Sequence, residues 1–521
     1  MKIYSPLTSE NQPALQEIEV STTFQVPNLH IIGLPAPEVS EAKERIRSAI
    51  EASDLTLPKR KIILNLSPAN IRKKGTGLDL AMALRILSES LTSPLRIGAW
   101  GELGLDGTVK PVGQLTRAIY GAWQSELPFL FVSAEEMSKA TTALKFIKNS
   151  RVFSTPPPRL IPISSLRAAW DILQDLLHDE DSLDHLESLP SYFENEQLPL
   201  HEDSISLRSL LPLSPLLERV IGISAAGLHH VFLVGPRGSG KSHALEWLIA
   251  LQQPSSPEDR LQHRLLMELN SSTLNPLAIR RISSQVRPAA LVGGATSYSI
   301  RPGEYSLAHG GLLIADEFPE WPRDSRESLR EPLERGRVTL TRAAGSFELP
   351  ARFLLAANGN FCPCGGWPVH FPRPPEESMD QMAAIKKCRC PENSRRLYLS
   401  RLSGPILDRI DLVAVVTAPR TLSKTLDPEL LLEKVRKTQE RLIQLWGQPP
   451  GLLSGTELET IIQQHQFHSL FLSSLPLGSL RSRHKLTRVA LSLAVWNSFD
   501  IPQKSHWLEA FQYRPESLVL E

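Results

Sequence analysis

The sequence predicts an α/β protein of several domains, with at least one parallel sheet that is covered on both faces. Three short apolar runs, "VFLVG", "GLLIADE" and "RFLLAAN", are typical of strands buried inside such a sheet. A glycine-rich loop joins the first run to a helical pattern, as in α/β folds. The length of 521 residues is too great for one ordinary core, so we expect three or four domains.

Residues 1–170 are predicted to form a mixed α/β domain. The segments "VSEAKERIRSAIEAS" and "DLAMALRILSES" have the apolar spacing of amphipathic helices. The runs "KIILNLSPA" and "FLFVSA" predict strands. From residue 168 to residue 207 there is no Lys or Arg and much Asp and Glu, so we interpret residues 171–207 as an acidic linker. The three apolar runs then place an α/β core at residues 208–420, and helical patterns fill residues 421–521.

Composition limits the cellular setting of the protein. Lys plus Arg is 57 and Asp plus Glu is 56, so the net charge of +1 gives no global indication of nucleic acid. The first residues lack the apolar segment of a signal peptide. No apolar run approaches the roughly 18–20 residues of a membrane span. Four cysteines in so long a chain do not make a disulfide framework. We expect a cytoplasmic protein that does not bind membranes.

The glycine-rich loop has the pattern of a phosphate-binding loop. It reads "GPRGSGKS" and fits G-x-x-x-x-G-K-[ST] between a buried strand and a helix. Its backbone N–H groups and the helix N-terminus would surround phosphate oxygens. Lys241 would contact the β and γ phosphates of ATP, and Ser242 would bind Mg²⁺. The predicted nucleotide-binding residues are Gly235, Pro236, Arg237, Gly238, Ser239, Gly240, Lys241 and Ser242.

Two further strands end in polar residues that suit phosphate chemistry. Asp316 and Glu317 follow "GLLIA", and ligands of open α/β sheets bind at the carboxyl ends of the strands. Asp316 is predicted to bind Mg²⁺, and Glu317 to act on the attacking water. The alternative is an ordinary strand end with two solvated acids. Asn358 and Asn360 end the third strand, and either amide could orient the water, although Asn-Gly is also a turn dipeptide.

All four cysteines fall in two C-x-C pairs, at residues 362–364 and 388–390. Cys362, Cys364, Cys388 and Cys390 offer four thiolates, the number that a tetrahedral structural zinc site needs. We therefore predict a zinc-binding insertion at residues 361–391, with an iron–sulfur cluster and unligated thiols as alternatives. A closed four-cysteine site has no open coordination position, so its role is predicted to be structural. Lys386, Lys387 and Arg389 form a local positive patch that suits DNA phosphates.

These features together resemble an AAA+ ATPase, and further segments narrow the resemblance. "RPGEYSLAHGGLLIADEF", "LREPLERGRVTLTRA" and "LSGPILDRIDL" look like the magnesium-chelatase-like ATPases of the ComM/YifB family. In the N-terminal half, "HIIGLPAPEVSEAKERIRSAI" and "GELGLDGTVKPVGQL" agree. The resemblance covers nearly the whole chain except the acidic linker. It implies a ring, expected to be a hexamer, that hydrolyses ATP and acts as a helicase on single-stranded or branched DNA, promoting branch migration in recombination.

The resemblance also implies roles for individual residues. An ungapped match places the sensor-1 asparagine at Asn360, with Asn358 as its rival. Arg409 in "ILDRID" resembles the arginine finger, which acts on the nucleotide of a neighbouring subunit. The C-terminal helices resemble the lid of these ATPases, and Arg481 matches its sensor-2 position, near Arg483. The loop departs from the family pattern at Arg237, where a second proline is usual.

The N-terminal domain resembles the fold of the Lon proteolytic domain. Lon-type proteolysis needs a serine nucleophile and a lysine base. The corresponding loop, "KKGTGLDLA", has no serine, although Thr76 is a conceivable substitute. The segment "PVGQLTRAIYGA" offers Arg117 in place of a lysine, and arginine stays protonated. We therefore expect a non-proteolytic version of this fold.

Three readings compete with a DNA motor. A metal-insertion chaperone of the magnesium-chelatase type is disfavoured by the N-terminal domain and the cysteines. A Lon-like protease is disfavoured by the missing dyad, and an inactive DNA scaffold by the intact ATPase residues. If the motor reading holds, Arg301, Arg337 and Arg342, in two segments expected to face the pore of a ring, are candidate DNA contacts.

Overall fold

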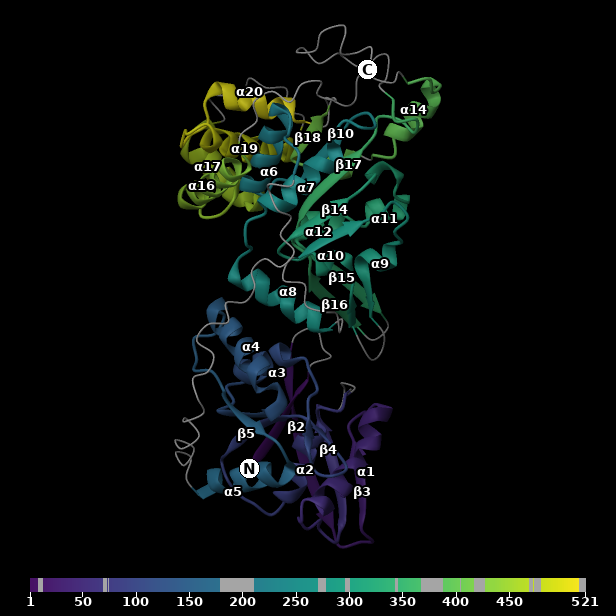
Figure 1. The fold of residues 1–521 in the computed structure, drawn as a ribbon, viewed down its shortest axis with the longest axis vertical. Helices are drawn as coiled ribbons and strands as arrows, with labels where there is room; N and C mark the ends of the chain where they lie inside the picture. Colours follow the sequence, from purple (N-terminus) through teal and green to yellow (C-terminus); the bar gives the residue numbers. More distant parts are fainter. Residues whose placement is uncertain are drawn as a thin grey trace.

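The computed structural model has two bodies arranged along its long axis (Figure 1). The N-terminal body runs from β1 to α5, and the C-terminal body runs from α6 to α20. Each contains a sheet with covering helices, so the prediction of a mixed α/β protein with parallel strands is confirmed. The structure describes residues 1–7, 13–68, 73, 75–178, 210–269, 278–295, 300–342, 345–366, 388–402, 404–416, 427–467, 472 and 479–514.

The N-terminal body is built on a seven-stranded mixed sheet of order β3-β4-β2-β1-β5-β8-β9. Strand β2 pairs antiparallel with β1 and β4, whereas β5, β8 and β9 run parallel. The strands of this body are β1 (Lys2–Leu7), β2 (Ala14–Thr23), β3 (Asn28–Ile32), β4 (Lys61–Ser67), β5 (Arg96–Trp100), β6 (Glu102–Leu103), β7 (Val109–Lys110), β8 (Phe129–Ser133) and β9 (Arg159–Ile163).

Helices of the N-terminal body confirm both predicted amphipathic segments, α1 and α2. The helices are α1 (Pro37–Ala52), α2 (Asp79–Leu87), α3 (Leu115–Gln124), η1 (Ala134–Glu136), α4 (Met137–Ser150) and α5 (Leu166–His178). Helix α5 crosses the predicted boundary at residue 170, and its Leu173 and Leu176 are buried in the core of this body. The remainder of the predicted linker lies outside the described residues.

The C-terminal body contains a five-stranded parallel sheet of order β11-β14-β17-β10-β18. Strand β17 lies between β14 and β10, so the three apolar runs predicted from sequence are neighbours. Alternate side chains enter two cores: Val231 and Leu233 of β10 face one, and Phe232 and Val234 face the other. The strands are β10 (Val231–Val234), β11 (Ile279–Ile282), β12 (Gly293–Ala295), β13 (Ile300–Pro302), β14 (Leu312–Ala315), β15 (Arg337–Arg342), β16 (Gly345–Pro350), β17 (Leu354–Gly359) and β18 (Leu412–Val415).

The C-terminal helices pack on one face of this sheet rather than around a core of their own. Leu431 of α16 and Val489 of α19 share a buried cluster with Val231 and Leu233. Asp427 begins α16 by accepting a hydrogen bond from the Glu429 N–H (2.9 Å). The helices are α6 (Pro215–Gly227), α7 (Lys241–Leu251), α8 (Pro257–Leu269), α9 (Pro288–Val292), α10 (Glu304–Leu307), η4 (Phe318–Glu320), α11 (Arg323–Glu327), α12 (Arg330–Arg335), α14 (Glu392–Leu399), α15 (Gly404–Leu407), α16 (Pro428–Trp446), η5 (Pro450–Leu452), α17 (Gly455–Gln464), α19 (Leu480–Trp496) and α20 (Lys504–Gln512).

The two bodies meet where α8 lies against α3 and α4 (Figure 1). The Glu268 carboxylate accepts hydrogen bonds from the N–H groups of Thr116 (3.2 Å) and Arg117 (3.0 Å) at the start of α3. Carboxylates are favourable at a helix N-terminus because the dipole there is positive. The fully buried Arg117 guanidinium donates to the Leu265 carbonyl (2.9 Å). Arg117 therefore anchors the joint between the bodies.

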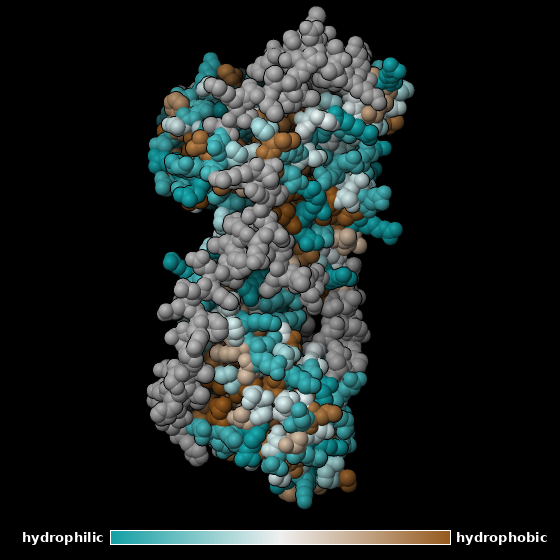
Figure 2. Space-filling model, viewed as in Figure 1, coloured by the Kyte–Doolittle hydropathy of each residue, from teal (hydrophilic) through white to brown (hydrophobic). Residues whose placement is uncertain are grey.

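None of the described helices combines the length and the apolar character that crossing a bilayer requires. Hydrophilic side chains predominate over the described parts of the face in Figure 2.

Candidate nucleotide site and cysteine cluster

The glycine-rich loop that is predicted to bind phosphate joins β10 to α7. Gly238 (φ +79°) and Gly240 (φ +88°) adopt left-handed backbone, which glycine enters at little cost. The Lys241 ammonium donates hydrogen bonds to the carbonyls of Gly235 (2.9 Å) and Pro236 (2.7 Å), so it lies inside the curve of the loop. Ser242 lies in the first turn of α7 and is exposed. The loop therefore presents an ammonium group and a hydroxyl at a helix N-terminus, as a phosphate site requires.

Burial and the neighbouring Arg237 guanidinium lower the pKa of Lys241 to about 8. Bound phosphates would raise this pKa again, because they favour the charged ammonium. Nucleotide binding would then take up a proton above pH 8, so affinity should fall as the pH rises. The expected loss approaches tenfold per pH unit. Titration with a fluorescent ADP between pH 7.5 and 9.5 measures it. Lys241→Arg, which stays charged, should give a flat profile, and a flat wild-type profile would contradict the prediction.

The carboxyl ends of β14 and β17 meet beside the loop. Asn358 Nδ2 donates to Asp316 Oδ1 (2.9 Å) and lies 3.5 Å from Ser242 Oγ. Asn358 Oδ1 accepts the backbone N–H of Glu317 (2.8 Å). Glu317 itself has a left-handed backbone (φ +48°), an unfavourable conformation for a non-glycine residue. The amide thus holds both acidic residues in place, and Ser242 and Asp316 are oxygen ligands suited to Mg²⁺.

This arrangement differs from the ungapped match that favoured Asn360. Asn358 is buried and lies in register with Leu233 of β10, whereas Asn360 comes after the end of β17. In a strand, side chains two residues apart point to the same face, but β17 ends at Gly359. Asn358 donates hydrogen bonds to the Asp316 carboxylate and the Ser242 hydroxyl and accepts one from the Glu317 N–H, so we propose Asn358 as the sensor residue.

Replacing Asn358 with alanine should lower the turnover of ATP by about 10- to 100-fold, the usual effect of losing a partner of a metal ligand. Nucleotide affinity should change less, because the phosphate loop is untouched. Asn360→Ala is the matched control and should retain nearly full turnover. A steady-state ATPase assay compares the two variants. A larger loss of turnover in Asn360→Ala would identify Asn360 as the sensor residue instead.

Arg281 of β11 was not predicted from sequence. Its Nε lies 3.8 Å from Asp316 Oδ2, and its guanidinium also pairs with Glu246 of α7. A guanidinium this close offsets part of the negative charge of the Asp316 carboxylate, the predicted Mg²⁺ ligand. The segment "IRRI" reads as a plain strand, so only the pairing of β11 with β14 brings Arg281 to this edge.

The four cysteines come together although 23 residues separate the two pairs. All four Sγ atoms lie within 4.8 Å of one another. Cys362 Sγ is 2.9 Å from Cys364 Sγ and 3.3 Å from Cys388 Sγ, too far for a disulfide. A tetrahedron of four thiolates around zinc has edges of roughly 3.8 Å, given Zn–S distances of about 2.3 Å. The donor set therefore fits a tetrahedral metal ion. Lys386 and Lys387 of the predicted positive patch lie outside the described residues.

The thiols of the cluster differ in acidity. Burial raises the pKa of Cys362. At Cys364, burial is outweighed by hydrogen bonds from the Cys362 thiol and the Gly366 N–H, so the pKa falls to about 6. A thiolate is thus favoured at Cys364 even before a metal binds. Phe361, next to the first pair, is fully buried in the sheet core and anchors the cluster to the end of β17.

Arg409 and Arg481 lie at the opposite edge of the sheet from the phosphate loop. Both guanidiniums pair with Glu334 of α12, Arg481 at 2.6 Å. Arg483, by contrast, pairs with Glu459 (2.7 Å) within the C-terminal helices. The shared carboxylate places Arg409 and Arg481 side by side, although 72 positions separate them in the chain.

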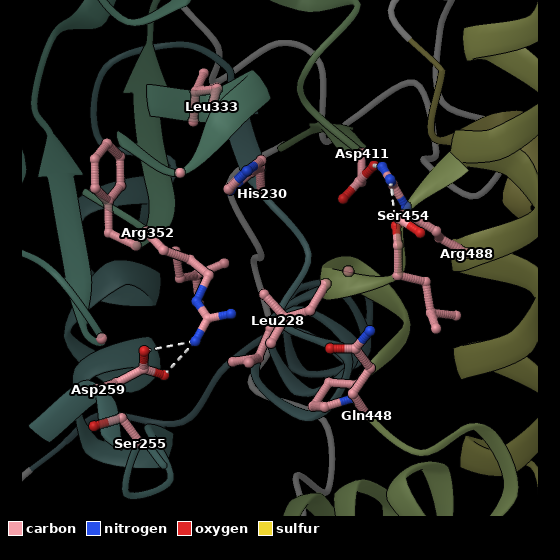
Figure 3. A pocket seen from close by; sticks show the side chains of 18 of the residues that line it. Leu228, His230, Ser255, Asp259, Leu333, Arg352, Asp411, Gln448, Ser454 and Arg488 are labelled. Atoms are coloured by element: carbon pink, nitrogen blue, oxygen red, sulfur yellow. Dashed lines mark hydrogen bonds and ion pairs between the residues drawn. The ribbon is translucent and has the colours of Figure 1, made fainter. Parts of the chain in front are cut away.

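A cavity of about 930 Å³ opens at the edge of the sheet where Arg409 and Arg481 lie. His230 and Leu354, at the amino ends of β10 and β17, line it together with both arginines. Figure 3 shows Arg352 paired with Asp259 on one side of this cavity, and Asp411 beside Arg488 on another. The parallel strands thus divide the predicted ATPase residues between two edges, with no direct contact described between the two groups.

Known protein families match segments of both bodies. Residues 215–424 match the family model described as magnesium chelatase, subunit ChlI, and residues 18–136 match a model described as subunit ChlI of Mg-chelatase. The protein YifB of Salmonella typhimurium is 30% identical over 95% of this chain and 93% of its own length. The chain belongs to the ComM/YifB family. YifB of Escherichia coli is also 30% identical, and competence protein ComM of Haemophilus influenzae is 28% identical over 100% of this chain and 98% of its own length.

Membership of the ComM/YifB family of magnesium-chelatase-like AAA+ ATPases accounts for the C-terminal body. Its parallel sheet carries the phosphate loop, the Asp316–Glu317 pair and Asn358 at one edge, in the arrangement that an AAA+ core needs. The family models also match the N-terminal body. The resemblance of that body to the Lon proteolytic domain stays a prediction.

Proposed function

We propose that this chain hydrolyses ATP at sites shared between neighbouring copies in a ring. The observation that carries this proposal is the division of the catalytic set. Lys241, Ser242 and Asp316 lie at the carboxyl edge of the sheet, while Arg409 and Arg481 lie at the amino edge. A guanidinium at the amino edge cannot serve the phosphates of its own chain, but a head-to-tail contact would bring it to those of a neighbour. Repetition of this contact closes a ring, which we expect to have six subunits.

Within such a site, each side chain has a defined task. Lys241 and the loop N–H groups bind the β and γ phosphates, and Ser242 and Asp316 hold Mg²⁺, which supplies charge neutralisation when bound. Glu317 orients the attacking water and accepts its proton, while Asn358 keeps Glu317 in position. Arg409 stabilises the charge that develops on the transferred phosphoryl group. Arg481, beside Arg409, acts on the same phosphates, so we infer that the sensor-2 arginine works between chains rather than within one.

We further propose that ATP hydrolysis drives a DNA motor that promotes branch migration. The support is the full-length similarity to competence protein ComM, together with two hairpins. The β15–β16 hairpin lies on the side of the C-terminal body that faces the N-terminal body (Figure 1), and β12 of the β12–β13 hairpin contacts β15. Arg301 and Arg337 are on these hairpins, and Arg301 is exposed. Arg337 pairs with Glu348 (2.8 Å), which reduces its availability for DNA. The side chain of Arg342 lies outside the described residues.

A four-way-junction assay tests the motor directly. Labelled junctions with homologous arms are incubated with the chain and ATP, and the resolved duplexes are counted. Wild type should resolve them in an ATP-dependent manner, and a Glu317→Gln chain, which keeps the DNA-facing surface, should not. ATP hydrolysis by wild type without any junction movement would reject the DNA motor and favour the alternative below.

The alternative is an ATPase chaperone of the magnesium-chelatase type, for metal insertion or protein remodelling. The family models favour it, because their description names a chelatase subunit and one of them covers residues 18–136. This match removes the N-terminal body as an argument against a chelatase-type role. The cysteine cluster remains the feature that separates the two readings.

We also propose that the cysteine cluster binds one zinc ion and that this site is structural. Purified protein should contain about one zinc per chain, because four thiolates fill a tetrahedral site. A Cys362→Ser/Cys388→Ser chain should lose the metal, as measured by atomic absorption after dialysis. Ser400→Ala, near the cluster in sequence but without a thiol, is the control. Equal metal content in wild type and the double variant would reject the zinc site.

For the N-terminal body, we propose a role without proteolysis. Arg117, at the position expected for a catalytic lysine, is buried and bonded to α8. A protonated guanidinium cannot act as a base, so this segment serves to join the N-terminal body to α8.

A further inference from the structure

The cysteine cluster and the phosphate loop are in direct contact. The backbone N–H of Arg237, in the middle of the phosphate loop, donates a hydrogen bond to the carbonyl of Gly365 (3.0 Å). A second hydrogen bond runs from the Gly235 N–H of the loop to the carbonyl of Gly359, the last residue of β17 (3.2 Å). The phosphate loop is therefore bonded at two points to the segment that leads from β17 into the cysteines.

Gly365 belongs to the turn formed by the first cysteine pair. Its N–H donates to the Cys362 carbonyl (3.0 Å), and the next N–H, of Gly366, points to Cys364 Sγ (3.4 Å). Gly365 has φ +70°, and a Cβ added there would lie 2.5 Å from Arg237 Cγ. The left-handed backbone favours glycine at this position, and the Arg237 side chain packs closely against it. Because the Gly365 carbonyl accepts directly from the Arg237 N–H, a movement of the cysteine turn would shift the backbone of the phosphate loop directly.

A metal would control this turn because it connects two distant parts of the chain. Cys362 and Cys364 lie on the turn itself, and Cys388 and Cys390 return after residue 387. Four bonds to one ion would fix the relative positions of these segments. The phosphate loop contains Gly238 and Gly240 in left-handed backbone, and ordering such a loop has a conformational entropy cost. A neighbour that is already rigid lowers this cost, so it favours the phosphate-binding conformation.

We propose that Arg237 is a positioning residue through which the metal-bound cysteine cluster braces the phosphate loop, so that metal and nucleotide bind with positive coupling. This inference rests on the proposed nucleotide and zinc sites. The contact is made by the Arg237 backbone and needs no particular side chain. Coupling between equilibrium affinities is reciprocal, so zinc should tighten nucleotide binding and nucleotide should tighten zinc binding by the same factor.

The experiment measures both directions on the full chain. Zinc-loaded protein is mixed with excess 4-(2-pyridylazo)resorcinol, and the rate of zinc release is followed by absorbance, with and without saturating Mg-ADP. Affinity for a fluorescent ADP is measured before and after zinc removal. We expect zinc removal to weaken ADP binding by about fivefold or more, within the usual range of coupling between sites. Tighter zinc binding in the ADP complex should in turn appear as slower zinc release.

Two substitutions at one position separate the backbone contact from the side chain. Arg237→Pro removes the N–H donor and should abolish the coupling in both measurements. Arg237→Ala keeps the N–H and should retain it. The coupling between ADP and zinc is measured on the wild-type chain, so the proposal can be tested even if Arg237→Pro folds poorly.

Three results would overturn the inference. The first is unchanged zinc release when fluorescence shows that ADP is bound, and the second is full coupling in Arg237→Pro. Both leave the proposed nucleotide site intact. The third is a zinc-loaded wild type that binds no ADP, which would overturn the proposed function as well.

Discussion

Replacing Arg409 with alanine should lower ATP hydrolysis by about 10³- to 10⁵-fold, the effect of losing an arginine finger. The guanidinium is expected to reach the γ phosphate of a neighbouring chain, where charge develops during transfer. Its pairing with Glu334 holds it at the amino edge of the sheet, and the Pro405 carbonyl accepts a second hydrogen bond (2.6 Å). Nucleotide affinity should change little, because Lys241 and the loop remain. Single-turnover hydrolysis and fluorescent ADP binding measure the two quantities separately.

Mixing variants shows whether Arg409 acts between chains. An Arg409→Ala chain has an intact phosphate loop, and a Glu317→Gln chain has an intact finger. In a mixed ring, about a quarter of the interfaces would combine the intact half of each, so two nearly inactive preparations should recover measurable activity together. Arg483→Ala serves as a control, because Arg483 is paired with Glu459 away from this edge. Mixtures that remain inactive would indicate that Arg409 works within its own chain or only supports the fold.

Replacing Glu317 with glutamine should lower hydrolysis by about 10²- to 10⁴-fold while leaving ATP bound. Glutamine keeps the size of the side chain but cannot accept the proton of the attacking water. The backbone at this position stays fixed, because Asn358 Oδ1 still accepts the residue 317 N–H. Assembly should therefore be unaffected. Hydrolysis is measured by phosphate release and binding by a filter assay with labelled ATP.

Glu320→Gln is the matched control for this substitution. Glu320 follows on the same 3₁₀ turn but pairs with Arg401 (2.9 Å), away from Asp316. It should retain most of the activity. If Glu317→Gln hydrolysed ATP at the wild-type rate, the catalytic carboxylate would have to be sought elsewhere, with Asp316 the first candidate.

Local sequence patterns predicted the parts of the site that lie within one short segment. Glycines of the phosphate loop adopt left-handed backbone, which other residues avoid. The segment "GPRGSGKS" therefore identifies the loop without information from any other part of the chain. The apolar runs of β10, β14 and β17 are buried on both faces, which makes them recognisable as strands of a parallel sheet. The C-x-C pairs indicated a metal site because thiol number and spacing are local properties.

Contacts between segments that are far apart in the chain could not be predicted from local sequence patterns. Sequence alone left Asn358 and Asn360 as alternatives, because the choice depends on which residue lies in register with β10 and β14. Arg281 was not expected beside Asp316, the predicted Mg²⁺ ligand, since only strand pairing brings it there. The sharing of Glu334 by Arg409 and Arg481 likewise depends on helices that are distant in sequence.

The sequence by itself determined the chemistry available to this protein: a phosphate loop, two acidic residues after a buried strand, four thiols and two arginines in family positions. These follow from side-chain type and short-range spacing. Only the tertiary structure decided how they are grouped, with the loop and Asp316 at one sheet edge, the arginines at the other, and the cysteine turn bonded to Arg237. The reason is physical, because strand order and helix packing set distances between residues that the chain keeps far apart.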